Sequence, residues 1–340
     1  MPKAPAFTVL CVFTALATIV EPRAQTNALD ALYAKAKAEE QVVLWGAQDR
    51  EIDWIPAEFA KRFPGITVNW AADRAAITKT ITEHRAGRYS VDVINFSVGG
   101  MLPLVDRRLL EKPDWSIFGI DGRDVLLDGT TAATHNLVYS IVYNEKLVAP
   151  SDLPRTWEDL LDAKWKGKLV ASQFLLPRLL GFLALEWGEP KTADYARALL
   201  QRQDVLVTRA PREGILHRGE RVVAVGEFVA SAIQWKSMGM PVTWAPMPVM
   251  PAAQFGAAAV VRAPHPHAAR LLAGWLATNE AKAARERLRF DADVRPGSRS
   301  ALAAALSRSG GRVILEDVSN MKARAALYER LSTLVTARAR

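Results

Sequence analysis

The side chains best suited to binding a small molecule lie in five short polar stretches, each directly after a short apolar run. They combine arginine, carboxylate, amide and hydroxyl groups. Arginine can bind carboxylate or phosphonate oxygens through two parallel hydrogen bonds, and acids in the same stretches would suit an ammonium group. These residues therefore predict a site for an anionic or zwitterionic organic solute. The candidates are Gln48, Asp49, Arg50, Asp73, Arg74, Ser97, Gly99, Gln173, Glu227 and Phe228.

Each of these candidates also has an alternative role in which it binds no ligand. An arginine in a polar loop commonly forms a surface ion pair, and Asp73 stands where a helix N-cap would be expected. Aromatic rings beside the polar stretches could stack on an organic ligand, although most buried rings serve only the core. The rings in question belong to Trp45, Phe96, Phe174 and Phe228. Both roles stay open from the residues alone.

His135 is a further candidate, because it begins a strongly β-like segment between two halves of the chain and could face the same site. Metal sites need several ligands at characteristic spacing, and no second ligand stands at such spacing from His135. A structural hydrogen bond is therefore the alternative role for this histidine. No metal ion and no cofactor are expected.

The sequence lacks the motifs of the common catalytic classes. It has no Gly-x-Ser-x-Gly, no His-Glu-x-x-His and no phosphate-binding glycine loop. Its single cysteine, Cys11, lies in an amino-terminal apolar run, and Ser172 and Ser231 have no histidine nearby in sequence. We therefore expect a binding protein and not an enzyme. A secreted transferase or hydrolase is the alternative.

Strands must place the candidates at one edge of a sheet. Val42–Trp45, Ile66–Trp70 and Val91–Phe96 are short apolar runs typical of strands, and helical spacing follows each of them, first at Ile55–Phe63. Asp53 is the expected N-cap of that helix. Strands separated by helices predict a parallel sheet, whose strand ends and helix amino-termini share one edge. The three polar loops should therefore lie together.

The middle of the chain repeats the pattern and predicts a second α/β unit. His135–Asn144 is β-like, and Lys168–Ala171 and Arg221–Val225 are expected strands with helices after them. Val242–Pro251 contains three prolines, which favour extended backbone, so it is either a crossover between two units or an edge strand. A strand at Gly256–Arg262 follows, and the tail from residue 300 predicts two or three further helices.

Composition and the amino-terminus indicate an exported soluble protein. Half of the 340 residues are apolar, and the formal net charge of +8 is scattered without a basic patch, which argues against nucleic-acid binding. Lys3, the apolar run Ala6–Val20 and the small residue Ala24 are typical of a secretory signal peptide. An uncleaved anchor is the alternative. We expect a periplasmic protein without disulfides.

Four segments carry a resemblance to a known family: Val42–Phe63 with Pro64-Gly65-Ile66 behind it, Ile141–Val148, Pro154–Lys168 and Gly256–Ala277. The chain resembles the extracellular solute-binding proteins of bacterial ABC importers, in the ferric-ion-binding-like branch of the type 2 periplasmic binding fold. The resemblance implies an α/β fold of two lobes, joined by an extended two-segment hinge. It implies a signal peptide at 1–24, lobe 1 at 25–134 and 247–290, lobe 2 at 135–246, and carboxyl-terminal helices at 291–340.

The ferric ligands of that branch do not carry over to this sequence. The family places a histidine after the first strand, an acid after the third and an adjacent tyrosine pair in the second lobe. Asp49, Val98 and Phe228-Val229 occupy those positions here, and the six tyrosines include no adjacent pair. Fe³⁺ favours phenolate and carboxylate oxygens, so iron is disfavoured. His265 and His267 match family positions that are polar without metal, and we do not interpret them as a metal pair.

The resemblance implies the function of a periplasmic substrate-binding component of an ABC importer. Such a protein, expected to be a monomer, would capture its small solute in an interlobe cleft by hinge closure. It would then deliver the solute to a permease in the inner membrane. The alternative is a periplasmic ligand-binding sensor for a chemoreceptor or a histidine kinase.

Overall fold

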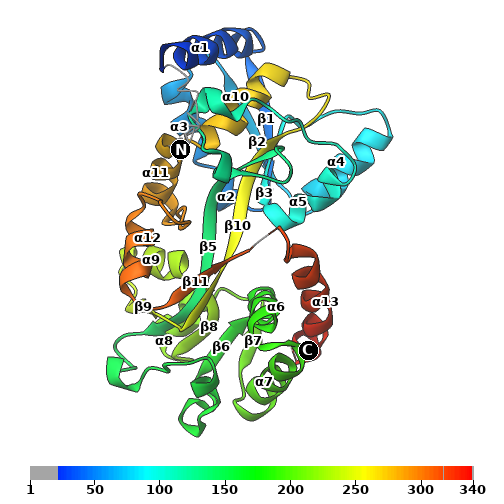
Figure 1. Ribbon diagram of the computed structural model, residues 1–340. Helices are drawn as coiled ribbons and strands as arrows, with labels where there is room; N and C mark the ends of the chain where they lie inside the picture. The colour runs from blue at the N-terminus through cyan, green and yellow to red at the C-terminus, as the bar shows by residue number, and fades with distance from the viewer. Residues whose placement is uncertain (1–21, 317, 339–340) are drawn as a thin grey trace, which may run out of the picture.

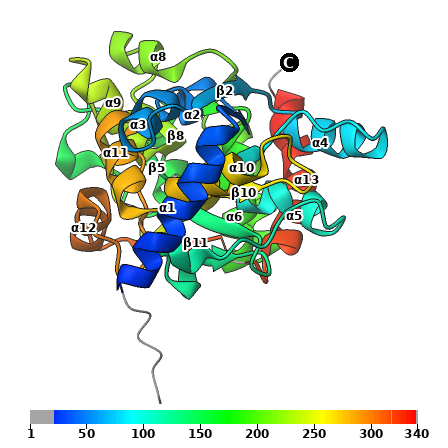
Figure 2. The same cartoon turned by 90° about the horizontal axis from the view of Figure 1, so that it is seen from above.

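Two α/β lobes lie one above the other in Figure 1, within the residues that the computed structural model describes, 22–316 and 318–338. The predicted signal peptide falls mainly at residues 1–21, outside the described residues, as does Cys11. The first described helix, α1 (Pro22–Ala38), lies over α10 in Figures 1 and 2. Within the described ranges, every helix is too short or too polar to cross a membrane.

The upper lobe begins with the predicted alternation of strands and helices. Its strands pair in the order β2-β1-β3, all parallel, and the helices between them cover the sheet. Asp53 was expected as the N-cap of the first crossing helix, but this prediction is wrong: Asp53 follows an extra short helix and Trp54 is the N-cap. The elements are β1 (Gln41–Gly46), α2 (Asp49–Ile52), α3 (Ile55–Arg62), β2 (Thr67–Ala72), α4 (Ala76–Arg85), β3 (Val93–Ser97) and α5 (Val98–Val105).

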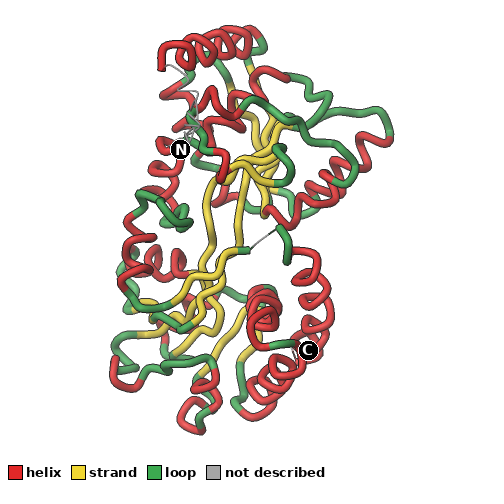
Figure 3. Tube along the Cα trace, viewed as in Figure 1, coloured by secondary structure: helices red, strands yellow, loops and turns green. Residues whose placement is uncertain are grey.

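Two long antiparallel strands, β5 (Thr131–Asn144) and β10 (Val249–Ala259), run from one lobe into the other (Figure 3). The start of β5 pairs with β10 and with β4 (Val125–Leu126), and its end pairs with strands of the lower lobe. Every residue of β5 is buried, which explains its apolar and β-branched composition. The strand predicted at Gly256–Arg262 therefore begins inside a longer strand, which ends at Ala259, before the predicted end.

The lower lobe contains a second parallel set of strands, β8-β6-β7. The proline-rich segment Val242–Pro251 was expected to be either a crossover or an edge strand. Its first residues form β9, which pairs with β5, and its last residues begin β10, which crosses between the lobes. The short strand β7 has no counterpart in the sequence prediction. The elements are β6 (Leu169–Ser172), α6 (Leu175–Trp187), α7 (Glu189–Arg202), β7 (Leu206–Thr208), α8 (Arg212–Arg218), β8 (Val223–Phe228), α9 (Val229–Ser237) and β9 (Val242–Ala245).

The carboxyl-terminal part returns to the upper lobe and then crosses to the lower one. The prediction of helices only from residue 300 is wrong in one respect, because β11 pairs in parallel with the start of β10. The last helix, α13, packs against α6 and α7, and the apolar side chains of α12 join the core of the lower lobe. The elements are α10 (Pro266–Leu276), α11 (Asn279–Arg289), α12 (Ala301–Arg308), β11 (Arg312–Leu315) and α13 (Met321–Arg338).

Local chemistry explains where the helices that matter for the site begin and end. The Ser172 hydroxyl accepts hydrogen bonds from the backbone N–H groups of Phe174 and Leu175 and so starts α6. Gly188, at a φ of 80°, ends that helix in a conformation that favours glycine. The Thr278 hydroxyl caps α11 by accepting from the N–H of Ala281. Each lobe then buries its own apolar core, centred on Phe59 and Trp275 above and on Trp157 below.

Candidate ligand-binding site

Strand register brings the three upper loops to one edge of the sheet. Gly46 on β1 pairs with Ala72 on β2 and with Asn95 on β3, so the chain leaves all three strands at the same level. The predicted residues of these loops therefore start from one edge. The Asn95 side chain is buried at that edge, and neither of its polar atoms has a hydrogen-bond partner among the described residues.

The lower lobe presents its loops in the same way. Ala171 pairs with Val225, and Ser172 with Thr208, so the ends of β6, β7 and β8 also align. Phe174 follows β6 and is 40% exposed, a large value for an aromatic ring. The backbone N–H of Gln173 donates to the Thr208 carbonyl, and its side chain is half-buried.

Loops of the two lobes meet at two places. The guanidinium of Arg74, from the upper lobe, lies 5.2 Å from the ring centroid of Phe174, from the lower lobe. Gly99, in the first turn of α5, lies against Glu316 and Arg324 of the carboxyl-terminal segment. A Cβ at position 99 would stand 2.9 Å from Oε1 of Glu316, so a side chain there would displace the Glu316 carboxylate.

Several predicted residues turn out to serve the fold through their own contacts. The Asp73 carboxylate accepts from the Ala75 N–H at 2.7 Å, which is a local cap. Both carboxylate oxygens of the buried Glu227 are engaged: Oε1 accepts from the Phe228 N–H at 3.1 Å and Oε2 from Arg212 Nε at 2.6 Å. Glu227 therefore orients Arg212. Ser97 is the N-cap residue of α5 but makes no capping bond through its hydroxyl.

The residues of the loop after β1 differ in their exposure to solvent. Gln48 and Asp49 are exposed, whereas Arg50 extends toward the end of α11. There its Nη2 donates to the Arg289 carbonyl at 3.3 Å and lies 3.9 Å from Oδ1 of Asp291. Arg50 is thus an ion-pair residue at one end, with its side chain still 35% exposed.

His135 packs inside the crossing strand. Its ring stacks on Phe255 at 4.6 Å, and its Nδ1 lies 3.0 Å from the hydroxyl of Thr134. Burial lowers the pKa of His135 well below its usual value, and the positive charges of Arg285 and Arg50 lower it further. The imidazole is therefore neutral at physiological pH. Its Nε2 has no partner among the described residues.

A buried cluster that the sequence prediction missed lies behind Arg50. Arg285 on α11 is 3% exposed in its side chain; its Nη1 donates to Asp291 at 3.1 Å and its Nη2 to the carbonyl of Glu51. Burial raises the pKa of the Glu51 carboxyl to about 7, although the charge of Arg285 opposes that rise. Its Oε2 has no hydrogen-bond partner among the described atoms. Positions so far apart in sequence gave no signal of this contact.

A second missed group surrounds Arg178 in α6. Arg178 is exposed; burial raises the pKa of Tyr139 on β5, and the positive charge of Arg178 opposes that rise. Its charge also acts on Glu51 of the upper lobe and on Glu316. Glu316 is itself paired with Arg324 of α13, and burial raises the pKa of Glu316 above its usual value. Arg178 was not predicted as a candidate because its neighbours in the sequence are apolar.

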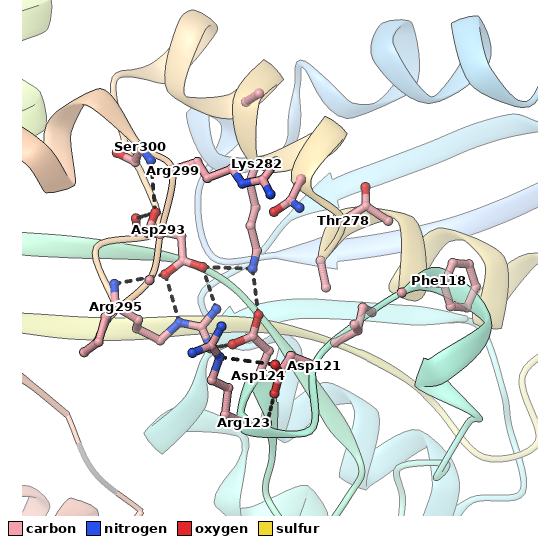
Figure 4. A pocket seen from close by; sticks show the side chains of 18 of the residues that line it. Phe118, Asp121, Arg123, Asp124, Thr278, Lys282, Asp293, Arg295, Arg299 and Ser300 are labelled. Carbon is pink, nitrogen blue, oxygen red and sulfur yellow. Dashed lines mark hydrogen bonds and ion pairs between the residues drawn. The ribbon is translucent and has the colours of Figure 1, made fainter. Parts of the chain in front are cut away.

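A cavity of about 520 Å³ lies elsewhere, between residues 118–124, α11 and residues 293–300 (Figure 4). No predicted ligand-binding residue lines it. Lys282 Nζ lies 2.8 Å from Asp293 and 3.3 Å from Asp124, and Arg295 lies 2.5 and 2.8 Å from the same two acids. The charges of these four residues are paired with one another, whereas Arg299, which also lines the cavity, is exposed.

The described residues contain no group of three or more histidines, cysteines or acids that could hold a metal ion. His265 bonds to Asp92 and His267 to Glu39, so each has a separate structural partner.

Comparisons with known proteins bear on the resemblance. Residues 47–201 match the family described as bacterial extracellular solute-binding proteins. The fold is that of the periplasmic binding proteins. The substrate-binding protein of an ABC transporter from Agrobacterium tumefaciens is 15% identical, with a TM-score of 0.73 over 88% of this chain and 96% of that one. No curated protein matches the sequence.

Ferric-binding proteins are also among the similar structures. The apo ferric ion-binding protein A of Pasteurella haemolytica has a TM-score of 0.71 at 16% identity, over 88% of this chain and 98% of that chain. Iron-bound HitA of Pseudomonas aeruginosa has a TM-score of 0.66 at 14% identity, over 88% and 99%. The α/β periplasmic binding fold predicted from the sequence, and the resemblance to the ferric-binding-like branch, are therefore confirmed. At this identity the structures establish the fold, and their iron is a property of those proteins.

Proposed function

We propose that the chain is the periplasmic substrate-binding component of an ABC importer that captures a small anionic or zwitterionic organic solute. The observation that carries this proposal is the contact of Arg74 with Phe174, which joins a strand-end loop of one lobe to that of the other. In open α/β sheets such strand ends are where ligands bind. The family match at residues 47–201 supports transport as the purpose of binding.

The two long strands supply the proposed hinge. We assign residues 25–134 and 247–290 to lobe 1 and 135–246 to lobe 2, so that β5 and β10 join them. Rotation of one lobe against the other about these strands would open and close the loops around a solute. The packing of α13 on α6 and α7 supports assigning α12, β11 and α13 to lobe 2. The protein would act as a monomer and deliver its solute to an inner-membrane permease.

The side chains at the lobe contacts favour an organic ligand over ferric iron. Phe228 and Val229 stand where the ferric branch has its tyrosine pair, and Tyr139 is buried. An enzymatic role finds no support in the arrangement either, because the Ser172 hydroxyl is used as a helix cap. Capture without chemistry is the function that the site supports best.

A ligand screen with a shape measurement tests this proposal. Thermal unfolding of the mature chain is followed with small carboxylates, phosphonates, polyamines and Fe³⁺, because a ligand bound only by the native state raises the unfolding temperature. Small-angle scattering with the best compound should show compaction. An unchanged scattering envelope at saturating ligand would contradict hinge closure, and stabilisation by Fe³⁺ alone would contradict an organic solute.

The sequence candidates Arg50 and Arg74 can then be compared as variants. Arg74 is exposed at the contact between lobes, whereas Arg50 is engaged by Arg289 and Asp291. We expect Arg74→Ala to weaken binding of an anionic compound more than Arg50→Ala does. Equal and unchanged affinities would show that neither arginine binds the solute.

A further inference from the structure

The last helix, α13, is attached to both lobes by buried apolar side chains. Its first residue, Met321, is 1% exposed and packs in a cluster of the upper lobe with Trp45, Val98 and Met101. The buried apolar side chains farther along the helix belong to the core of the lower lobe: Leu327, Leu331 and Val335. Figure 1 shows α13 running from beside α5 past α6 to α7, and it packs against all three helices. The helix therefore joins the lobes in addition to β5 and β10.

Polar contacts fix the start of α13 beneath α5. Arg324 forms an ion pair with Glu316, and its guanidinium lies 4.9 Å from the ring centroid of Phe182 in α6. Glu316 is in turn bonded to Gln254 of the crossing strand β10 through both its backbone carbonyl and its side chain. Gly99 of α5 faces this pair, because a Cβ built there would stand 3.3 Å from Nη2 of Arg324. The start of α13 is thus held to the lower lobe and to the crossing strand while it contacts the upper lobe.

The attachments of α13 to the two lobes differ in strength. On the lower lobe, several buried side chains pack along α6 and α7, and Arg330 adds two hydrogen bonds to Glu189, of 2.7 and 2.9 Å. On the upper lobe, the buried apolar contact is the single side chain of Met321. Burial stabilises in proportion to the apolar area removed from water, so the upper attachment is the weaker one. A methionine side chain is also flexible enough to leave and re-enter a pocket.

We propose that Met321 is a releasable anchor, through which α13, moving with the lower lobe, restrains the opening of the two lobes. The proposal rests on hinge motion in the function proposed above, and it names what regulates that motion. Rotation of the lobes must withdraw Met321 from its cluster in the upper lobe. Met321 therefore sets the fraction of molecules whose lobes are together, and with it the apparent affinity for the solute, without touching the solute.

Distance measurements by double electron–electron resonance test the anchor without any ligand. The mature chain lacks Cys11, so spin labels can be attached at Arg85→Cys and Arg202→Cys, at the exposed ends of α4 and α7. We expect Met321→Ala to shift the population toward a longer distance by roughly 10- to 100-fold, the factor that corresponds to burial of one methionine side chain. Met321→Leu, which keeps the apolar volume, should retain the distance of the unsubstituted chain.

Met101→Ala is the matched control. Met101 is the same residue type in the same cluster and is 0% exposed, but it belongs to α5 of the upper lobe itself. Its truncation should lower the unfolding temperature as Met321→Ala does and leave the distance between the labels unchanged. An equal change of distance in both variants would show general loosening of the upper lobe and would overturn the anchor.

A graded series keeps the test decisive if Met321→Ala does not fold. Met321→Val removes less apolar surface, so it should give a smaller shift in the same direction. Unchanged distances in the folded variants of Met321 overturn the proposal. A wild type that already shows only the longer distance overturns it as well, because the anchor would then be released in the free protein.

These outcomes are separate from those that test solute capture. The distances are measured without a solute, so a ligand screen in which nothing binds counts against the proposed function and leaves the anchor to be decided by the labels. Conversely, an unchanged distance in Met321→Ala removes the anchor and leaves capture by the cleft intact.

Discussion

Two clusters of charged side chains each include one residue of α11 and at least one residue of the segment after it. They differ in how closely their opposite charges approach. The outer cluster comprises Asp124, Lys282, Asp293 and Arg295; the inner cluster comprises Arg50, Glu51, Arg285 and Asp291. Every charge of the outer cluster lies within 3.3 Å of an opposite one. In the inner cluster, Oε2 of Glu51 and Oδ1 of Asp291 are buried without a hydrogen-bond partner among the described residues.

The cavity of about 520 Å³ lies beside the outer cluster and not beside the proposed ligand-binding residues. The outer cluster lines the 520 Å³ cavity of Figure 4, and each of its charges has an oppositely charged neighbour, although Nη1 of Arg295 is buried without a hydrogen-bond partner among the described residues. In the inner cluster Arg50 is 35% exposed and the other three residues are buried, and the charge of Arg178 opposes the rise in the pKa of Glu51. A buried polar group without a hydrogen bond destabilises the fold. Groups with strongly shifted pKa values occur often at functional sites.

The largest effect in this comparison is expected from breaking the inner ion pair. Asp291→Ala leaves Arg285 buried without its acid, and such a change typically costs about 3–5 kcal/mol of unfolding free energy. Urea unfolding at pH 7 measures it. Asp194→Ala, which removes the exposed partner of Arg197, is the control and should cost less than about 1 kcal/mol. If Asp291→Ala lowers the unfolding free energy no more than the control does, the guanidinium of Arg285 must become hydrated in the variant.

The next effect concerns the proton on Glu51. Its pKa is raised from 4.5 to about 7, so the folded protein holds a proton that the unfolded chain releases, and stability falls as pH rises through this window. Wild-type stability should therefore drop by about 3 kcal/mol between pH 4.5 and 7 from this group alone. Glu51→Gln should abolish that drop, as followed by urea unfolding at pH 5 and pH 8.

A matched variant makes the Glu51 experiment specific. Glu329 lies exposed on α13, so Glu329→Gln removes an acid without touching the interior. It should leave the pH dependence of the wild type unchanged. If Glu51→Gln and Glu329→Gln give the same pH profile, the Glu51 carboxyl ionises as easily as a surface acid.

The outer cluster should respond in the opposite pH direction and more weakly. Burial opposes ionisation of Asp293, but the hydrogen bonds and charges of Arg295 and Lys282 outweigh it and lower the pKa of Asp293. Its contribution is present above the usual pKa of 3.8 and is lost as pH falls through the lower folded value. Asp293→Asn should cost about 1–3 kcal/mol at pH 7 and progressively less below pH 4, by thermal unfolding. A cost that persists unchanged at pH 2 would contradict ion pairing as its source.

The smallest effect on stability is expected at the contact between the lobes. Phe174→Ala removes the partner of Arg74 at a site that is 40% exposed, worth about 0.5–1 kcal/mol. Hydrogen exchange in residues 71–74 should nevertheless become faster, because the loop loses its contact in the other lobe. Arg74→Ala should give the same exchange pattern. Unchanged exchange in both variants would mean that the contact does not restrain the lobes.

Local patterns in the sequence were sufficient for most of the architecture. Val42–Trp45, Ile66–Trp70 and Val91–Phe96 fall within or beside β1, β2 and β3, because apolar runs bounded by polar loops report burial directly. Asp53 failed as an N-cap because a short helix, Asp49–Ile52, precedes it and its carboxylate pairs with Arg289. The strand at Arg312–Leu315 was missed because four residues that pair only with β10 carry little signal of their own.

The site was predicted less completely than the fold. Loop candidates such as Arg74 and Gly99 do lie where the lobes meet, since strand ends in a parallel sheet share an edge. Arg178 was overlooked because it stands in an apolar helix, Leu175–Trp187, that reads as core. The loop position of Glu227 alone made it a candidate, and only its bonds to Arg212 and Phe228 reveal that both oxygens are engaged.

By itself the sequence determined an α/β chain with polar loops at strand ends, because alternating apolar and polar runs depend only on neighbours along the backbone. The tertiary structure decided which charges meet. The contacts of Arg285 with Glu51, and of Arg74 with Phe174, join residues from separate elements. Their protonation and freedom to bind depend on burial and distance, which are properties of the packed molecule and of no local segment.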